Sequence, residues 1–354
     1  MNELFKYVLY KLLWSVIQIE LILIFTITLG ITLARIYYYV KSKWDDYIES
    51  RLSDQILELY LKQKEICDFN LKWRFRGFKL MIETLERFEM RFSDAHWDKV
   101  KQAVVEKYLI NRAHRNVQKF FWLKRQLAAR CFLLTPEMAD EKSVEALLHD
   151  KVYLVRIVAA ACIVDKLSNK QLFYQVLETM SNENAHSRFS YRDAIIHAGR
   201  EKFDWIVELL KMGTPDESII EICLDILIEC TCSNLEVAIK FAKHQNPKIR
   251  LQAIRILGKV PIAKSYELLM ESLSDECENI RVAALKSIAS LNYIEAADNV
   301  SASLDDPTYV VRLEAALTLR SFGEIGIYML SDLKKRSKSA SEVCQYALEL
   351  PLYS

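Results

Sequence analysis

An arginine that is followed three places later by a small residue recurs along this chain at a fixed interval. The series consists of Arg125, Arg156, Arg250, Arg281 and Arg312. The interval between Arg125 and Arg156 is the same as that between Arg250 and Arg281 and that between Arg281 and Arg312. The interval between Arg156 and Arg250 is one residue longer than three such intervals. A fixed period of about 30 residues is typical of a supersecondary unit that buries its apolar face only by stacking on the next copy. The chain is therefore predicted to fold as a stacked repeat.

The copies also agree in the residues after the arginine. Alanines lie three places after it and aliphatic residues seven places after it in the three best copies: Ala253, Ala284 and Ala315, then Leu257, Ile288 and Leu319. Offsets of three and seven lie on one face of a helix. Weaker copies without the arginine are expected at Tyr191 with Ala194 and at Ile220 with Cys223. With only seven glycines and six prolines, and no alternating valine-rich runs, the chain is predicted to be all-α.

An aspartate lies six places before three of the arginines, at Asp150, Asp275 and Asp306. Asn246 before Pro247 predicts a helix start, and Gly258 predicts the end of the same helix. Together these features divide each unit into two helices.

The pattern resembles the HEAT repeat, especially the short bacterial form related to the phycobilisome lyase HEAT-like family, most specifically over residues 245–323 and more loosely over 120–350. The resemblance implies an α-solenoid of about seven helix pairs over residues 119–354. It also implies that the arginines and the aspartates form an internal ladder between neighbouring repeats, because partly buried opposite charges must be paired. The alternative is that the arginines form a ligand-binding stripe.

The second strong feature is an almost wholly apolar stretch over residues 12–34, with Trp14 near its start and Tyr37, Tyr38 and Tyr39 after its end. The stretch from Trp14 to Tyr37 rises about 34 Å in a helix, which matches the separation of the aromatic belts of a bilayer. A single transmembrane helix is predicted within an N-terminal segment of residues 1–40. The rival interpretations are a cleaved signal peptide and a buried helix.

Charges and thiols indicate the orientation. Arg35, Lys41 and Lys43 follow the apolar stretch, against Lys6 and Lys11 before it, so the large C-terminal part is expected in the cytoplasm of a single-pass inner-membrane protein. Cys131, Cys162 and Cys223 occupy positions for small apolar residues, which indicates reduced core cysteines. Cys230 and Cys232 lack a second pair, and neither a metal site nor a cofactor is predicted.

Five residues of the apolar stretch are candidate contacts with a membrane partner. Gln18 and Glu20 are polar groups at membrane depth, which are costly unless they are paired. Thr26, Gly30 and Ala34 form a small-residue stripe at four-residue spacing, which lets a second helix approach closely. The partner is expected to be a membrane protein or a second copy of this chain. Alternatively, Glu20 reaches the nearer headgroups or pairs with Lys11.

Residues 41–118 are predicted to form a basic juxtamembrane helical region. Residues 41–130 carry 20 basic and 13 acidic side chains, whereas residues 131–354 carry 25 and 32. Basic and aromatic residues interleave in one candidate lipid or partner contact, formed by Lys72, Trp73, Arg74, Phe75, Arg76 and Lys79, and again from Lys119 to Lys124. Such clusters suit a lipid interface or an acidic protein surface, or the aromatic residues fill a core. Nucleic acid is not an expected partner, because the chain as a whole is not basic.

No catalytic or nucleotide-binding motif was found, and the six histidines show no HExxH spacing. A solenoid offers long open surfaces, so binding is favoured over catalysis. The expected function is a non-enzymatic membrane-tethered scaffold whose cytoplasmic solenoid binds a protein. The architecture is similar to bacterial membrane-anchored HEAT proteins that accompany polysaccharide-synthesising glycosyltransferases, which implies a partner of that class. The alternatives are a HEAT-like lyase or glycosylase subunit and a peripheral lipid sensor.

Overall fold

The computed structural model describes residues 2–61, 77–213, 216–229, 235–336 and 338–350. Across these residues every regular element is a helix, which confirms the all-α prediction. The described chain divides into two compact units, residues 1–139 and 140–354, called unit 1 and unit 2 below.

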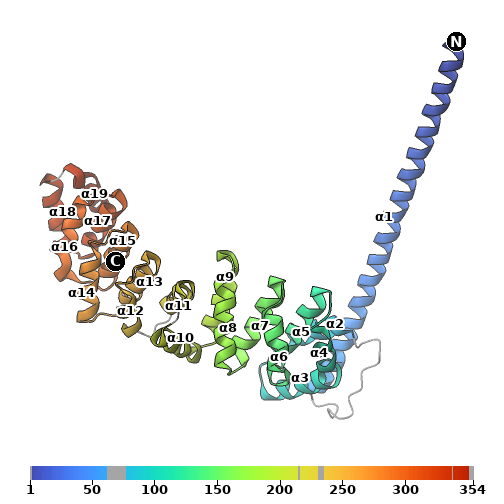
Figure 1. The fold of residues 1–354 in the computed structure, drawn as a ribbon, viewed down its shortest axis with the longest axis horizontal. Coiled ribbons are helices and arrows are strands. Elements are labelled where there is room, and N and C mark those ends of the chain that lie inside the picture. The colour runs from blue at the N-terminus through green and yellow to red at the C-terminus, as the bar shows by residue number, and fades with distance from the viewer. Residues whose placement is uncertain (1, 62–76, 214–215, 230–234, 337, 351–354) are drawn as a thin grey trace. The chain divides into compact units, whose positions relative to one another are not determined.

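In the described part of unit 1, one very long helix, α1, is followed by four shorter α-helices (Figure 1). Its elements are α1 (Asn2–Tyr60), α2 (Phe78–Glu89), α3 (Ala95–Tyr108), α4 (Ile110–Asn116), α5 (Trp122–Leu134) and the short 3-10 helix η3 (Pro136–Met138).

The two halves of α1 have different surroundings. From Leu13 to Tyr47 every side chain is exposed, whereas Ile48, Leu52 and Ile56 are buried at four-residue spacing. This spacing places the three side chains on one helical face, which packs against α2 and α3. The helix runs without a break from the apolar stretch into the core of unit 1, and its N-terminal part is long and apolar enough to cross a bilayer.

Aromatic rings close the core of unit 1 beside the end of α1. Phe88 stacks on the fully buried Trp97 with 5.6 Å between ring centroids, and Tyr60 packs on Phe92 at 4.2 Å. The Trp97 ring nitrogen donates to Glu89, and the buried Lys101 donates to the same carboxylate at 2.8 and 2.9 Å. Burial alone lowers the pKa of Lys101, but the hydrogen bonds to Glu89 and Asp98 outweigh it and raise that pKa.

Unit 2 is a succession of helices in two layers. Its α-helices are α6 (Glu141–Leu148), α7 (Tyr153–Lys166), α8 (Lys170–Ser181), α9 (Ala185–His197), α10 (Arg200–Met212), α11 (Glu217–Glu229), α12 (Leu235–Phe241), α13 (Pro247–Leu257), α14 (Ala263–Ser272), α15 (Glu278–Ser290), α16 (Ala297–Ala302), α17 (Tyr309–Ser321), α18 (Glu324–Arg336) and α19 (Lys338–Glu349). Two 3-10 helices flank α16: η4 (Ile294–Ala296) and η5 (Ser303–Asp305).

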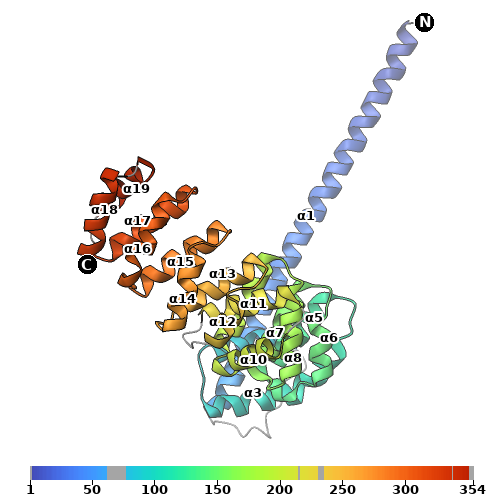
Figure 2. The same cartoon turned by 60° about the vertical axis from the view of Figure 1, so that its left-hand side comes forward.

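Each odd-numbered helix from α7 to α17 packs on the next odd-numbered helix, and even-numbered helices form the other layer (Figures 1 and 2). The arginine-containing segments predicted from the period form odd-numbered helices. The predicted start and end of one such helix are also confirmed: α13 begins at Pro247, Asn246 accepts from the Lys248 amide at 3.0 Å, and the helix ends at Leu257.

Small residues let the odd-numbered helices approach closely. Ala253, Ala284 and Ala315 are fully buried, as their repeat position requires. At Gly258 an added Cβ would overlap the side chain of Ser287 on α15 and lie 3.1 Å from its Cα. The close contact between α13 and α15 therefore requires glycine at position 258.

Candidate interaction surfaces

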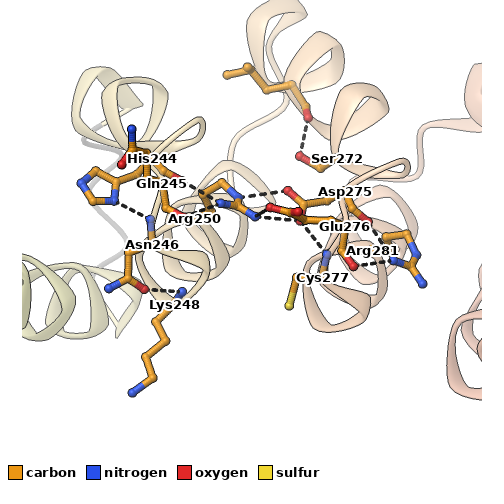
Figure 3. Close-up of polar contacts among 11 residues, drawn as sticks. His244, Gln245, Asn246, Lys248, Arg250, Ser272, Asp275, Glu276, Cys277 and Arg281 are labelled. Atoms are coloured by element: carbon orange, nitrogen blue, oxygen red, sulfur yellow. Dashed lines mark hydrogen bonds and ion pairs between the residues drawn. The ribbon is translucent and has the colours of Figure 1, made fainter.

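Arg250 and Arg281 each join the turn before their own helix to the turn before the next odd-numbered helix. Figure 3 shows these contacts for Arg250. Arg250 donates through Nη1 to the carbonyls of His244 and Gln245, both at 2.9 Å, just before its own helix. Its Nε and Nη2 donate to the two carboxylate oxygens of Asp275 at 3.0 and 2.9 Å, just before α15. Hydrogen bonding to Asp275 raises the pKa of Arg250.

The aspartate of each step also belongs to the next step. Asp275 accepts from the amide of Cys277 at 2.9 Å, which fixes the turn before α15, and its own carbonyl accepts from Arg281 at 2.7 Å. Arg281 in turn donates to both carboxylate oxygens of Asp306 at 2.8 and 3.0 Å. The carbonyl of Asp306 accepts from Arg312 at 2.8 Å. A continuous series of charge-assisted hydrogen bonds thus runs from α13 to α17.

The earlier copies vary this arrangement. Arg156 donates to the carbonyl of Asp150 at 2.8 Å in the usual way, but its ion-pair partner is Glu183. Asp150 accepts from the amide of Val152 at 2.8 Å. In unit 1, Arg125 donates to the carbonyls of Lys119 and Phe120, both at 2.8 Å. The contact with the two carbonyls before the helix is therefore present in both units.

The register predicted at Tyr191 was wrong by three places. Arg188 donates to the carbonyl of Glu183, five places before it, at 2.9 Å, as the other repeated arginines do. Tyr191 lies three places later, at the position of the small residue, and is fully buried. The signal in the sequence was Arg188, which follows Arg156 by one residue more than the period. It was missed because Tyr191, a large residue, occupies the position where the repeat has a small one. At Ile220 the arginine is absent, as expected, and a buried aliphatic side chain takes its place.

The five candidate residues of the apolar stretch lie on the exposed part of α1, and their contact with a partner stays a prediction. The hydroxyl of Thr26 donates to the carbonyl of Leu23 at 2.9 Å, which satisfies it within the helix. A Cβ added at Gly30 would meet no atom within 4 Å. A second helix therefore has open access to this position.

Most of the basic and aromatic cluster at residues 72–79 lies outside the described residues: Lys72, Trp73, Arg74, Phe75 and Arg76. Lys79 is described, is exposed on α2, and lies 3.7 Å from Glu83.

An open groove of about 750 Å³ lies on α13 and α15, in a place that was not predicted from the sequence. Leu251, Val282 and Ala283 contribute apolar walls, and Arg255, Lys259 and Lys286 contribute positive charge. Within the described part of the chain, the groove has no acidic lining residue, although Glu314 of α17 approaches Lys286 at 3.6 Å. We call this feature the basic groove. One signal was available, because Arg255 and Lys286 are one period apart and so occupy the same position in successive repeats.

Among the described residues, no group of three or more histidine, cysteine or acidic side chains is placed to hold a metal ion. Cys131 and Cys223 are buried, and burial raises the pKa of each thiol to about 12. Such thiols stay protonated and are weak nucleophiles.

Comparison with known proteins agrees with this geometry. Residues 235–320 match the family model described as HEAT repeats. This part of the chain is a HEAT-repeat solenoid. No curated protein matches.

Similar solved structures include Escherichia coli YibA, which is 16% identical with a TM-score of 0.39, covering 73% of this chain and 97% of that one. A mutant of the karyopherin Kap121p is 12% identical with a TM-score of 0.46, covering 87% and 42%. Human deoxyhypusine hydroxylase, solved in complex with glycerol, is 14% identical with a TM-score of 0.30, covering 86% and 96%. Because these scores are low, the fold assignment rests on the HEAT-repeat match and the helices themselves.

Proposed function

We propose that this protein is a membrane-tethered scaffold whose HEAT solenoid binds an acidic segment of a protein partner. The observation that carries the proposal is the basic groove, an open surface on successive repeats that is lined by three cationic side chains and by apolar residues. A groove of this kind suits an extended segment that carries both acidic and apolar side chains. The positive charge of the groove is local, since the sequence of the solenoid as a whole is acidic.

The exposed apolar half of α1 supports the tether. In water, the exposed run from Leu13 to Val40 would form a large apolar surface, which soluble monomers rarely expose. In a bilayer the same surface is solvated by lipid, and the helix satisfies its own backbone groups. We propose that this half crosses the inner membrane and that unit 2 lies in the cytoplasm, because basic residues are more frequent after the apolar stretch than before it.

The proposed partner is an integral membrane protein. Its class, a polysaccharide-synthesising glycosyltransferase, rests on the resemblance to membrane-anchored bacterial HEAT proteins. Under this proposal, Gln18, Glu20 and the stripe of Thr26, Gly30 and Ala34 contact its transmembrane region. The basic groove contacts one of its soluble segments.

The test is photocrosslinking of the full-length protein in native membranes, followed by mass spectrometry. A photoreactive residue at Val282 in the groove should capture one integral membrane protein. The double variant Arg255→Glu, Lys286→Glu should lose that product, because the groove then repels an acidic segment. The control Lys264→Glu changes an exposed lysine outside the groove and should keep it. Capture of no integral membrane protein, or equal capture by both variants, would refute the proposed contact.

The tether has its own test. Alkaline carbonate should leave the full-length chain in the membrane fraction, whereas a Leu21→Arg, Ile24→Arg variant should be released, because central arginines oppose insertion. Release of the unmodified chain would contradict the tether.

A further inference from the structure

Besides the basic groove of unit 2, a hollow lined by basic side chains lies in unit 1, the unit that contains α1. It encloses about 500 Å³ between α2, α4, the following turn and α5. Five of its lining side chains are basic: Lys79, Arg112, Arg115, Lys119 and Lys124. Among the described residues that line it, none is acidic, and the carboxylate of Glu83 lies outside the lining, 3.7 Å from Lys79. We call this feature the cationic hollow.

Arg112 shows how closely the positive charges are placed. Its guanidinium is half-buried and lies 5.1 Å from the centre of the Phe78 ring. Burial, together with the neighbouring charge of Arg115, lowers the pKa of Arg112. An anion in the hollow would offset this repulsion, because opposite charge favours the ionised form.

The N-terminal end of α5 adds to the positive electrostatic potential of the cationic hollow. Helix α5 begins at Trp122, and its N-cap residue makes no side-chain hydrogen bond. Lys124 lies in its first turn, and Lys119 lies just before it. Negative groups stabilise a helix N-terminus, so an anion bound beside Lys119 and Lys124 would also be stabilised by this end of α5.

Exposed aromatic side chains border the same hollow. Phe120 is 91% exposed and Phe121 is 65% exposed, between the lining residues Lys119 and Leu123. Two adjacent phenylalanines in water are unfavourable, whereas aromatic side chains are enriched at the headgroup level of membranes. The combination of a cationic hollow and an apolar rim is complementary to a lipid surface that carries negative headgroups.

The distance along α1 agrees with this assignment. Among the side chains of α1 whose burial is described, Ile48 is the first buried one, and the proposed membrane span is followed by aromatic residues that begin at Tyr37. The helix rises about 16 Å from Tyr37 to Ile48. Since α1 is continuous over this stretch, it holds unit 1 close to the headgroups of the leaflet that it leaves.

We propose that the cationic hollow binds the phosphate-bearing headgroup of an anionic phospholipid, with Phe120 and Phe121 in the interfacial layer. This inference rests on the proposed membrane tether. It assigns to unit 1 a lipid-binding role that is separate from the protein-binding role proposed for the basic groove of unit 2.

The test is a titration of the full-length protein in neutral detergent with short-chain phosphatidylglycerol, short-chain phosphatidylcholine and inorganic phosphate. Phosphatidylglycerol should bind best. The double variant Arg115→Gln, Lys119→Gln, both exposed lining residues, should bind it about 30-fold more weakly, since each basic side chain contributes about fivefold near an anionic surface. The control Arg91→Gln, Lys99→Gln removes the same charge from exposed positions outside the hollow and should bind as the unmodified protein does.

Three results would overturn the proposal: equal binding of the two lipids, equal loss in both variants, or phosphate binding as tightly as phosphatidylglycerol, which would indicate a site for free phosphate. Membrane attachment is tested separately, by carbonate extraction of the same variants. Both should stay in the membrane fraction, so a failed titration with an intact tether refutes the lipid site alone. Release of the unmodified chain refutes the tether on which it rests.

Discussion

Arg281 binds Asp306 through both carboxylate oxygens, and the two side chains are about nine-tenths buried. The same guanidinium also donates to the carbonyl of Asp275, so one side chain fixes the turns at both ends of a repeat. Removal of one partner leaves a buried charge unpaired, which costs more than the pair itself contributes.

We therefore predict that Arg281→Ala lowers the free energy of unfolding by about 2–4 kcal/mol. Arg281→Lys should recover only a small part of the loss, because an ammonium group cannot reproduce the planar fork of donors. The measurement is urea unfolding of the full-length protein in detergent. The control is Lys243→Ala, which breaks an ion pair of 2.6 Å with Glu271 that is more than half exposed and should change stability by less than about 0.5 kcal/mol. Equal effects of Arg281→Ala and Lys243→Ala would show that the ladder does not stabilise the fold.

The same ladder predicts a dependence on pH. Burial alone would raise the pKa of Asp306, but hydrogen bonds from Arg281 and the Thr308 amide outweigh it and lower that pKa. A carboxyl whose pKa is lowered on folding stabilises the protein above its unfolded pKa of about 3.9, and this stabilisation is lost as the pH falls through the folded pKa. The stability difference between the unmodified protein and Asp306→Asn should therefore be constant from about pH 7 to pH 5 and shrink below about pH 4. Urea midpoints across this range test it, and a constant difference down to about pH 3 would exclude Asp306 as the titrating group.

Gly258→Ala should destabilise the contact between α13 and α15. The backbone at Gly258 is helical, so alanine is conformationally acceptable there, and the cost of about 1–3 kcal/mol comes only from overlap with Ser287. The second change Ser287→Gly should recover part of it. Gly77→Ala, where the nearest atom to the new Cβ is 3.6 Å away, serves as the control. Thermal melts of the three variants and the unmodified protein would decide, and an unchanged midpoint for Gly258→Ala would mean that the helices can separate without cost.

Gly30→Ile should weaken any helix association through the small-residue stripe, because the added side chain keeps a second backbone away. Energy transfer between labelled copies in bilayers measures self-association, and co-purification from native membranes detects association with a different membrane protein. At least one signal should fall several-fold, whereas the neighbouring Leu29→Ile, which adds no bulk, should change neither. If both signals survive Gly30→Ile, the stripe is not an interface.

The sequence predicted the parts of the fold that repeat. The positions of Arg250, Arg281 and Arg312 located three helices and the turns before them, because the same hydrogen bonds recur at the same offsets. The prediction was wrong at Tyr191, where a large side chain occupies the small-residue position and the interval exceeds the period by one place. Arg188 could have been found only by allowing both changes at once.

The basic groove and the cationic hollow were harder to predict than the arginine–aspartate ladder. Lining residues such as Arg112 and Lys124 come from separate helices, and their proximity depends on how those helices pack. An exposed lysine carries no pattern that distinguishes a hollow from an open surface. The equivalent positions of Arg255 and Lys286 were visible, but one coincidence of charge in two repeats is weak evidence without the geometry.

Helix α1 has a mechanical consequence. No loop, proline or glycine interrupts α1 between Ile31 and Tyr60, so one continuous helix joins the end of the apolar stretch to the part that is buried in unit 1. A tilt or rotation of the apolar half must turn the buried half through a similar angle, and α2 and α3 are carried with it. The rest of unit 1 therefore cannot rotate independently of the N-terminal half of α1, as a domain on a flexible linker could. A protein that binds this half of the helix would also determine the orientation of unit 1.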